Sequence, residues 1–168
     1  MSYGYEFSKR ASVETPMTQS LTDFFRDKQQ RSVEETRGID WEGRRREWLD
    51  NLGHLYALVE TVLAEPIVQG TAQISRRPRQ ITEDHLGTYD VEELILTVGD
   101  ERVTFAPAAR NVIGAAGRVD VRGERGEAML VVQPGPRWSI VESKYPQLRT
   151  IPLDEATLAD LLQGVMRA

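Results

Sequence analysis

The spacing of apolar residues changes near Pro66, and this change constrains the fold more than any other feature of the sequence. Before Pro66, large apolar side chains recur at the three- and four-residue intervals of one helix face. After it, the period is close to two as far as Pro152, which is typical of strands. A short helical pattern then closes the chain. The upstream stripe consists of Trp48, Leu49, Leu52, Leu55, Tyr56, Val59, Val62 and Leu63, and the closing one of Leu158, Leu161, Leu162, Val165 and Met166.

The region of period two divides at its turn signals into five to seven strands. Tight turns are expected at Gly99-Asp100, at residues 123–126 and at Pro134-Gly135-Pro136. Successive hairpins form an antiparallel meander, in which helices can cover one face of the sheet. We therefore predict an α+β fold: a β-meander packed by an N-terminal amphipathic helix and a C-terminal helix. The predicted strands span residues 67–75, 91–98, 102–106, 117–122, 128–133, 137–143 and, as a seventh, 148–151.

Three polar residues are placed to begin helices. Ser20, with Asp23 three residues later, predicts a helix that runs to about Arg37 and ends at Gly38. Asp40 is expected to cap the main amphipathic helix, which should end at about Ala64, before Pro66. Asp154 should begin the last helix. These boundaries divide the chain into residues 1–37, an arm with a weakly amphipathic helix, and residues 38–168, a single α+β domain.

Residues 1–37 carry aromatic side chains but little apolar surface with which to fold. Tyr3, Tyr5 and Phe7 alternate as they would on a strand, and the first helix offers only a small apolar patch, formed by Leu21, Phe24 and Phe25. Beyond this patch the helix is polar all round, so its order should come from a partner or from the rest of the fold. We expect these six residues to bind a partner, because aromatic anchors carry much of the energy of protein interfaces.

Composition excludes several classes of function. The chain has 168 residues, a net charge of −5 and no cysteine. The negative charge argues against general nucleic-acid binding, and the absence of cysteine excludes disulfides and thiolate metal sites. No apolar run approaches the roughly 20 residues that cross a bilayer. We expect a cytoplasmic protein with no membrane association, no metal and no cofactor.

One tripeptide has the residue types of a catalytic site. Glu142-Ser143-Lys144 would place a carboxylate and an ammonium on the same side of a strand. It resembles the Glu-x-Lys half of the PD-(D/E)xK nuclease signature, with Asp120 as the nearest upstream acid. The resemblance implies a metal-dependent nuclease in which Asp120, Glu142 and Lys144 hold a divalent ion and orient a water molecule. The other interpretation of Glu142 and Lys144 is a surface ion pair.

A second alternative is nucleic-acid binding through Arg76, Arg77 and Arg79. Arginine pairs well with phosphate groups. Because Pro78 interrupts this cluster, we expect it to occupy a loop. Solvated surface charge explains the same residues without any ligand.

The sequence as a whole favours a non-enzymatic protein-interaction module, such as an adaptor, an accessory subunit or an immunity-type binder. Its partner would be another protein or a second copy of the chain. The nuclease and nucleic-acid hypotheses remain as alternatives.

Overall fold

A computed structural model describes residues 19–110 and 115–168. The described residues form two compact units, one ending at Ile39 and the other spanning Asp40–Ala168. The first contains helix α1, Leu21–Thr36. The second contains α2 (Trp41–Val62), the short helix α3 (Ala64–Val68), seven strands and α4 (Glu155–Val165). The aromatic residues Tyr3, Tyr5 and Phe7 lie outside the described residues.

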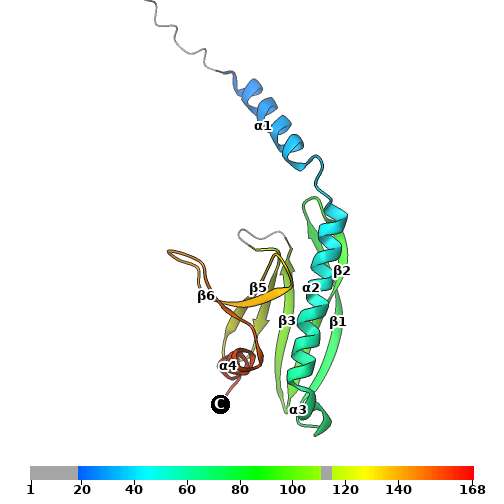
Figure 1. Ribbon diagram of the computed structural model, residues 1–168, viewed down its shortest axis with the longest axis vertical. Helices are drawn as coiled ribbons and strands as arrows, with labels where there is room; N and C mark the ends of the chain where they lie inside the picture. Colours follow the sequence, from blue (N-terminus) through cyan, green and yellow to red (C-terminus); the bar gives the residue numbers. More distant parts are fainter. Residues whose placement is uncertain (1–18, 111–114) are drawn as a thin grey trace, which may run out of the picture. The chain divides into compact units, whose positions relative to one another are not determined.

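The seven strands form one antiparallel sheet in which the spatial order equals the chain order (Figure 1). This is the meander predicted from the sequence, and the α+β class is confirmed. The predicted turns at residues 99–100, 123–126 and 134–136 join neighbouring strands. The strands are β1 (Gln73–Glu83), β2 (Gly87–Val98), β3 (Glu101–Ala109), β4 (Arg118–Arg122), β5 (Glu127–Gln133), β6 (Arg137–Ser143) and β7 (Arg149–Pro152).

The start of the sheet differs from the prediction. Residues 64–68, expected partly as strand, are helical, and the first strand begins only at Gln73. Pro66 lies in the first turn of α3, where its missing N–H costs no helical hydrogen bond. The expected loop around Arg76, Arg77 and Arg79 was wrong, because these residues lie in β1. Their neighbour Pro78 is tolerated there because β1 is an edge strand.

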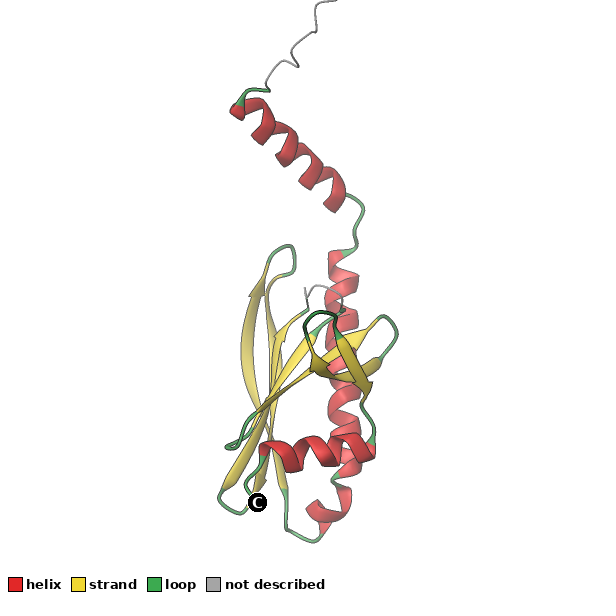
Figure 2. Cartoon of the chain, turned by 90° about the vertical axis from the view of Figure 1, so that its left-hand side faces the viewer, coloured by secondary structure: helices red, strands yellow, loops and turns green. Residues whose placement is uncertain are grey.

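Helices α2 and α4 pack on the same face of the sheet and cross it in different directions (Figure 2). Trp48 of α2 lies against Gly117, where a Cβ atom would overlap the indole ring. At the other end, a Cβ atom on Gly123 would overlap the carbonyl oxygen of Val165 in α4. Because most of the sheet side chains pointing toward the helices are apolar, a single core forms between them. Its fully buried side chains include Trp48, Leu55, Val59, Leu94, Leu96, Val103, Phe105, Val119, Val121, Leu130, Val132 and Leu158.

The pairing of β2 with β3 is much shorter than the hairpin formed by β1 and β2. The β1–β2 ladder runs from Gln73↔Thr97 to Glu83↔Gly87, whereas the β2–β3 ladder stops at Leu94↔Phe105. Beyond that point, side chains connect the hairpin to β3. The Arg79 guanidinium donates to the carbonyl oxygen of Pro107 at 3.4 Å, and a Glu83 carboxylate oxygen accepts from the backbone N–H of Arg110 at 2.9 Å. The distal half of the hairpin is therefore linked to the β3 segment by polar side chains in place of a backbone ladder.

Candidate functional site

Helix α1 is built as the sequence predicts, with its first turn closed by Ser20. The Ser20 hydroxyl oxygen accepts from the Asp23 N–H at 3.1 Å, and the hydroxyl donates to the Asp23 carboxylate at 2.7 Å. These bonds satisfy an otherwise free N–H group and fix where the helix starts. Gly38, just beyond the helix, has a φ of 86°, a conformation that suits glycine. The predicted cap is confirmed.

No residue of α1 is buried, although the helix carries large apolar side chains. Leu21 is 67% exposed, Phe24 48% and Phe25 58%. Val33, further along, is 50% exposed. The rings of Phe24 and Phe25 lie 5.9 Å apart between centroids, so they form one continuous apolar surface. We call Leu21, Phe24 and Phe25 the α1 patch.

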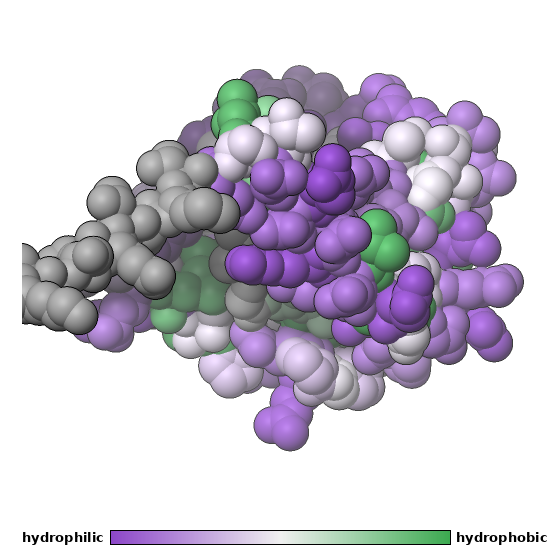
Figure 3. Space-filling model, turned by 90° about the horizontal axis from the view of Figure 1, so that it is seen from above, coloured by the Kyte–Doolittle hydropathy of each residue, from purple (hydrophilic) through white to green (hydrophobic). Residues whose placement is uncertain are grey.

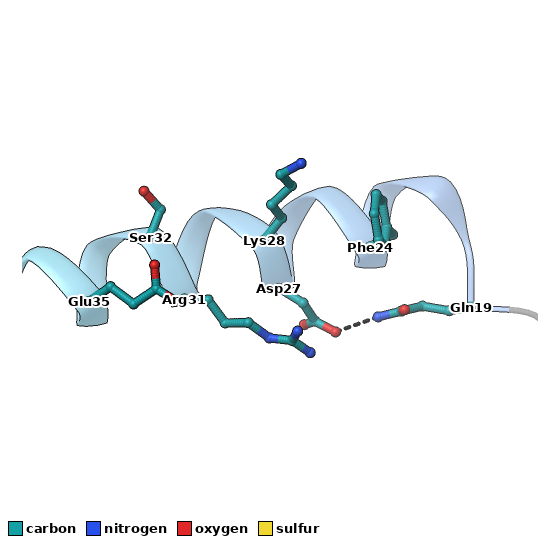
Figure 4. Close-up of a pocket in the computed structure, with 7 residues that line it drawn as sticks. All are labelled: Gln19, Phe24, Asp27, Lys28, Arg31, Ser32 and Glu35. Atoms are coloured by element: carbon teal, nitrogen blue, oxygen red, sulfur yellow. Dashed lines mark hydrogen bonds between the residues drawn. The ribbon is translucent and has the colours of Figure 1, made fainter. Parts of the chain in front are cut away.

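Polar side chains flank the α1 patch (Figure 4). A shallow hollow on the side of α1 is lined by Phe24 and by polar residues that include Asp27 and Arg31. The Gln19 side chain donates to the Asp27 carboxylate across it. All of these residues come from α1 and the residue before its cap. A single helix cannot enclose a small molecule, so the hollow suits contact with a larger surface.

The three residues of the nuclease hypothesis line one hollow on the sheet face that the helices leave open. Asp120 comes from β4, Glu142 from β6, and Lys144 follows β6, around a volume of about 310 Å³. The three residues therefore lie around the same hollow, as the nuclease hypothesis requires. The β6–β7 pairing shifts register between Val141 and Ser143, at Glu142.

The carboxylate of Asp120, however, is already bound by arginine side chains. The Arg118 Nε donates to it at 2.7 Å, and the Arg122 guanidinium approaches at 3.4 Å. Two guanidinium groups satisfy the oxygens that a divalent cation would need. Within residues 19–110 and 115–168, no group of three or more acidic or histidine side chains is arranged to hold a metal ion. The arginine contacts of Asp120 therefore weigh against a divalent cation at this carboxylate.

The arginines of the nucleic-acid hypothesis do not form one surface, because strand alternation separates them. Arg76 points toward α2, where it contacts Glu60 at 2.8 Å, and it also contacts Glu92 of β2 at 3.1 Å. These carboxylates raise the pKa of Arg76, and the largest effect comes from the hydrogen bond that its guanidinium donates to Glu60. Its guanidinium also lies 5.4 Å from the centroid of the Tyr56 ring. Arg76 therefore connects α2 to the β1–β2 hairpin.

Arg77 and Arg79 point to the other face and share one carboxylate. The Arg77 Nε donates to Glu93 at 2.9 Å, and the Arg79 guanidinium donates to the second Glu93 oxygen at 3.2 Å. Glu93 is only 7% exposed, so its pairing with two cations offsets the cost of burying a charge. Sequence reasoning did not identify Glu93, because the register Arg77↔Glu93 appears only once the strands are paired.

In the face shown in Figure 3, hydrophilic side chains predominate and apolar ones occur as small separate spots. Within the described parts of the chain, none of the helices is long and apolar enough to cross a membrane.

Comparisons of the chain with protein-family models, with curated proteins and with solved structures gave no significant match.

Proposed function

We propose that the chain is a non-enzymatic protein-interaction module that binds a partner protein through α1. The observation that carries this proposal is the exposure of the α1 patch on a helix with no buried residue. Apolar residues spaced i, i+3 and i+4 are the anchors by which amphipathic helices enter the grooves of partner proteins. Leu21, Phe24 and Phe25 have this spacing.

The energetics favour a bound state for this helix. A 16-residue helix is close to the length below which isolated helices are marginal in water. Burying the exposed fractions of Leu21, Phe24 and Phe25 would contribute roughly 3–5 kcal/mol, at 1.5–3 kcal/mol for each fully buried side chain. A partner groove therefore supplies both the burial and the order that α1 lacks alone. The partner is a different protein or a second copy of the chain.

The aromatic residues of the arm extend this proposal. Tyr3, Tyr5 and Phe7 precede α1 in sequence, and we include them in the same partner contact because of their alternating spacing. A cytoplasmic location also belongs to the proposal, because a chain without cysteine suits a reducing compartment.

Site-directed photo-cross-linking in the native host tests the proposal. A photoreactive phenylalanine analogue replaces Phe24, Phe25 or, as the matched control, Gln30. Gln30 is nine residues from Leu21, which places it about 180° around the helix. We expect adducts of one common mass from positions 24 and 25 and none from position 30. An adduct with the chain itself would identify the partner as a second copy.

A substitution completes the test. Phe25→Glu should abolish the adduct formed from position 24, because a carboxylate at the centre of an apolar contact is costly. Gln30→Glu adds the same charge on the opposite side and should leave that adduct unchanged. Equal labelling from all three positions, or no adduct from positions 24 and 25, would contradict binding through α1.

A further inference from the structure

A cleft in the Asp40–Ala168 unit lies between α2, the β5–β6 turn and the segment that joins β7 to α4. Its volume is about 730 Å³, within the range of roughly 300–1,000 Å³ typical of small-molecule sites. Six lining residues are apolar and four are polar. The apolar ones are Leu58, Pro134, Pro136, Trp138, Pro152 and Leu153, and the polar ones are His54, Gln133, Arg137 and Ser139.

The apolar floor of this cleft is fixed by hydrogen bonds. The indole N–H of Trp138 donates to the carbonyl oxygen of Asn51 in α2 at 2.9 Å. The Leu153 N–H donates to the Trp138 carbonyl oxygen at 3.0 Å. The Trp138 ring also packs against Trp48, with 6.1 Å between centroids. Because these contacts come from three segments of the chain, the cleft is formed before any ligand arrives.

The cleft contains no acidic residue, although the chain has 26 aspartates and glutamates. By contrast, the hollows on α1, on the open sheet face, beside Tyr56 and beside α4 are each lined by at least one carboxylate. Arg137 lies in the cleft wall, and no ion pair within the described ranges includes it. Its guanidinium therefore differs from those of Arg77, Arg79, Arg118 and Arg122, which already bind carboxylates.

We propose that this cleft binds a small amphipathic anion. The apolar body of the ligand, aromatic or branched aliphatic, lies against Leu58 and Trp138, and its carboxylate or sulfonate pairs with Arg137. A guanidinium forms charge-assisted hydrogen bonds with such groups, and the absence of lining carboxylates removes competition for it. This site is independent of α1 and goes beyond the proposed interaction with a protein.

Two fluorescent probes of similar shape test the charge of the ligand. Anilinonaphthalene sulfonate is an anion, whereas phenylnaphthylamine is its uncharged counterpart. Titration of the full chain should show saturable binding of one anilinonaphthalene sulfonate per chain, and about tenfold weaker binding of phenylnaphthylamine, as loss of a charge-assisted hydrogen bond implies. Equal affinity for both probes, or binding without saturation, would overturn the proposal.

Substitutions then locate the site. Arg137→Gln should weaken the anionic probe about tenfold and leave the neutral probe unchanged, which removes the preference between them. Leu58→Trp should weaken both probes, because the larger ring fills the cleft. Arg125→Gln is the matched control: it removes the same charge from an exposed turn and should change neither affinity.

Circular dichroism and thermal unfolding of each variant verify that the native fold, rather than a loosened state that binds such dyes, is being titrated. An equal loss of anionic-probe affinity in Arg125→Gln and Arg137→Gln would overturn the assignment to this cleft, since it would show a nonspecific effect of net charge. Unchanged affinity in both Arg137→Gln and Leu58→Trp would overturn it as well.

Discussion

Gly117→Ala tests the closest contact between the sheet and the main helix. A Cβ atom at this position would overlap ring carbons of Trp48, which is 0% exposed. The indole cannot move away easily, because Trp138 packs on it from β6. Overpacking of this kind costs typically 1–3 kcal/mol, and we expect about 3 kcal/mol here because the neighbouring ring is large and enclosed. For a domain of this size, the loss lowers the melting temperature by roughly 10 °C.

Gly53→Ala is the matched control, because it makes the same chemical change in α2. Gly53 is exposed within the helix, and nothing lies within 4 Å of the position of its Cβ atom. Alanine is favoured over glycine in a helix interior by about 1 kcal/mol, so this variant should be more stable than the parent. The two Gly→Ala substitutions should thus shift stability in opposite directions.

The assay is urea unfolding followed by circular dichroism and by tryptophan fluorescence. A double-mutant cycle with Trp48→Phe isolates the overlap, because phenylalanine lacks the second ring of the indole. We expect Gly117→Ala and Trp48→Phe together to cost at least about 1 kcal/mol less than the sum of the single changes. Gly117→Ala with parental stability, or strict additivity in the cycle, would refute the packing of α2 against β4 described above.

Three further predictions concern the arm, two tyrosines and the nuclease hypothesis. Deletion of residues 1–37 should change the unfolding free energy of the remaining domain by less than about 0.5 kcal/mol, because α1 has no buried residue. The truncated chain should also fail to co-purify with the partner that cross-linking of the full chain identifies. Unfolding of the truncated chain would show instead that α1 belongs to the core. Burial raises the pKa of the Tyr56 and Tyr89 hydroxyls above 10. The stability that each contributes is therefore complete below pH 10, where both the folded and the unfolded chain keep the proton. At higher pH the unfolded chain releases its proton first, so stability falls by about 1.4 kcal/mol per pH unit for each tyrosine. Urea titrations between about pH 8 and pH 11 should show this fall in the parent and a shallower one in Tyr56→Phe. Incubation of the parent and of Glu142→Gln with DNA and Mg²⁺ or Mn²⁺ should give no cleavage by either; cleavage by the parent that Glu142→Gln abolishes would restore the nuclease hypothesis.

The parts of the fold that the sequence predicts well are those determined by local chemistry. Ser20, Asp40 and Asp154 each accept a hydrogen bond from an N–H three residues later, as side chains that begin helices do. The Gly99 turn adopts a φ of 62°, which glycine permits at little cost. Such features depend on a few adjacent residues, so the sequence alone predicts them.

The first strand could not be predicted in the same way, because its order comes from its partner. Most residues of β1 are exposed, and its middle contains Arg76, Arg77, Pro78 and Arg79. No alternation of apolar and polar residues marks such a strand. It is held by the β2 ladder and by ion pairs with carboxylates 14 to 16 residues away in sequence. Only the register of β1 against β2 shows which carboxylates these arginines meet.

The candidate sites differ in the same way: one follows from adjacent residues, and the other depends on how distant segments pair. The α1 patch follows from side chains within one helical turn, and the structure places all three on exposed positions. The cleft combines α2 with segments about 80 to 100 positions later in the chain, including the β5–β6 turn and the segment that joins β7 to α4. Neither His54 nor Arg137 has a local pattern that would associate them. Only the sheet topology brings them to one wall.

Charged side chains that already have a partner within the sheet can be distinguished from side chains that a ligand could still bind. Glu93 and Asp120 are each paired with two arginines, so the guanidinium groups of Arg77, Arg79, Arg118 and Arg122 already bind carboxylates of the sheet. A ligand would gain little binding free energy from such groups, because it must first displace the carboxylate that they already bind. The α1 patch and Arg137 differ in kind. Phe24 and Phe25 retain apolar area that water contacts, and Arg137 retains donors without a carboxylate among the described residues. Binding can still gain free energy by burying Phe24 and Phe25 and by pairing Arg137 with an anion. The first change requires a protein partner, and the second requires a small anionic ligand.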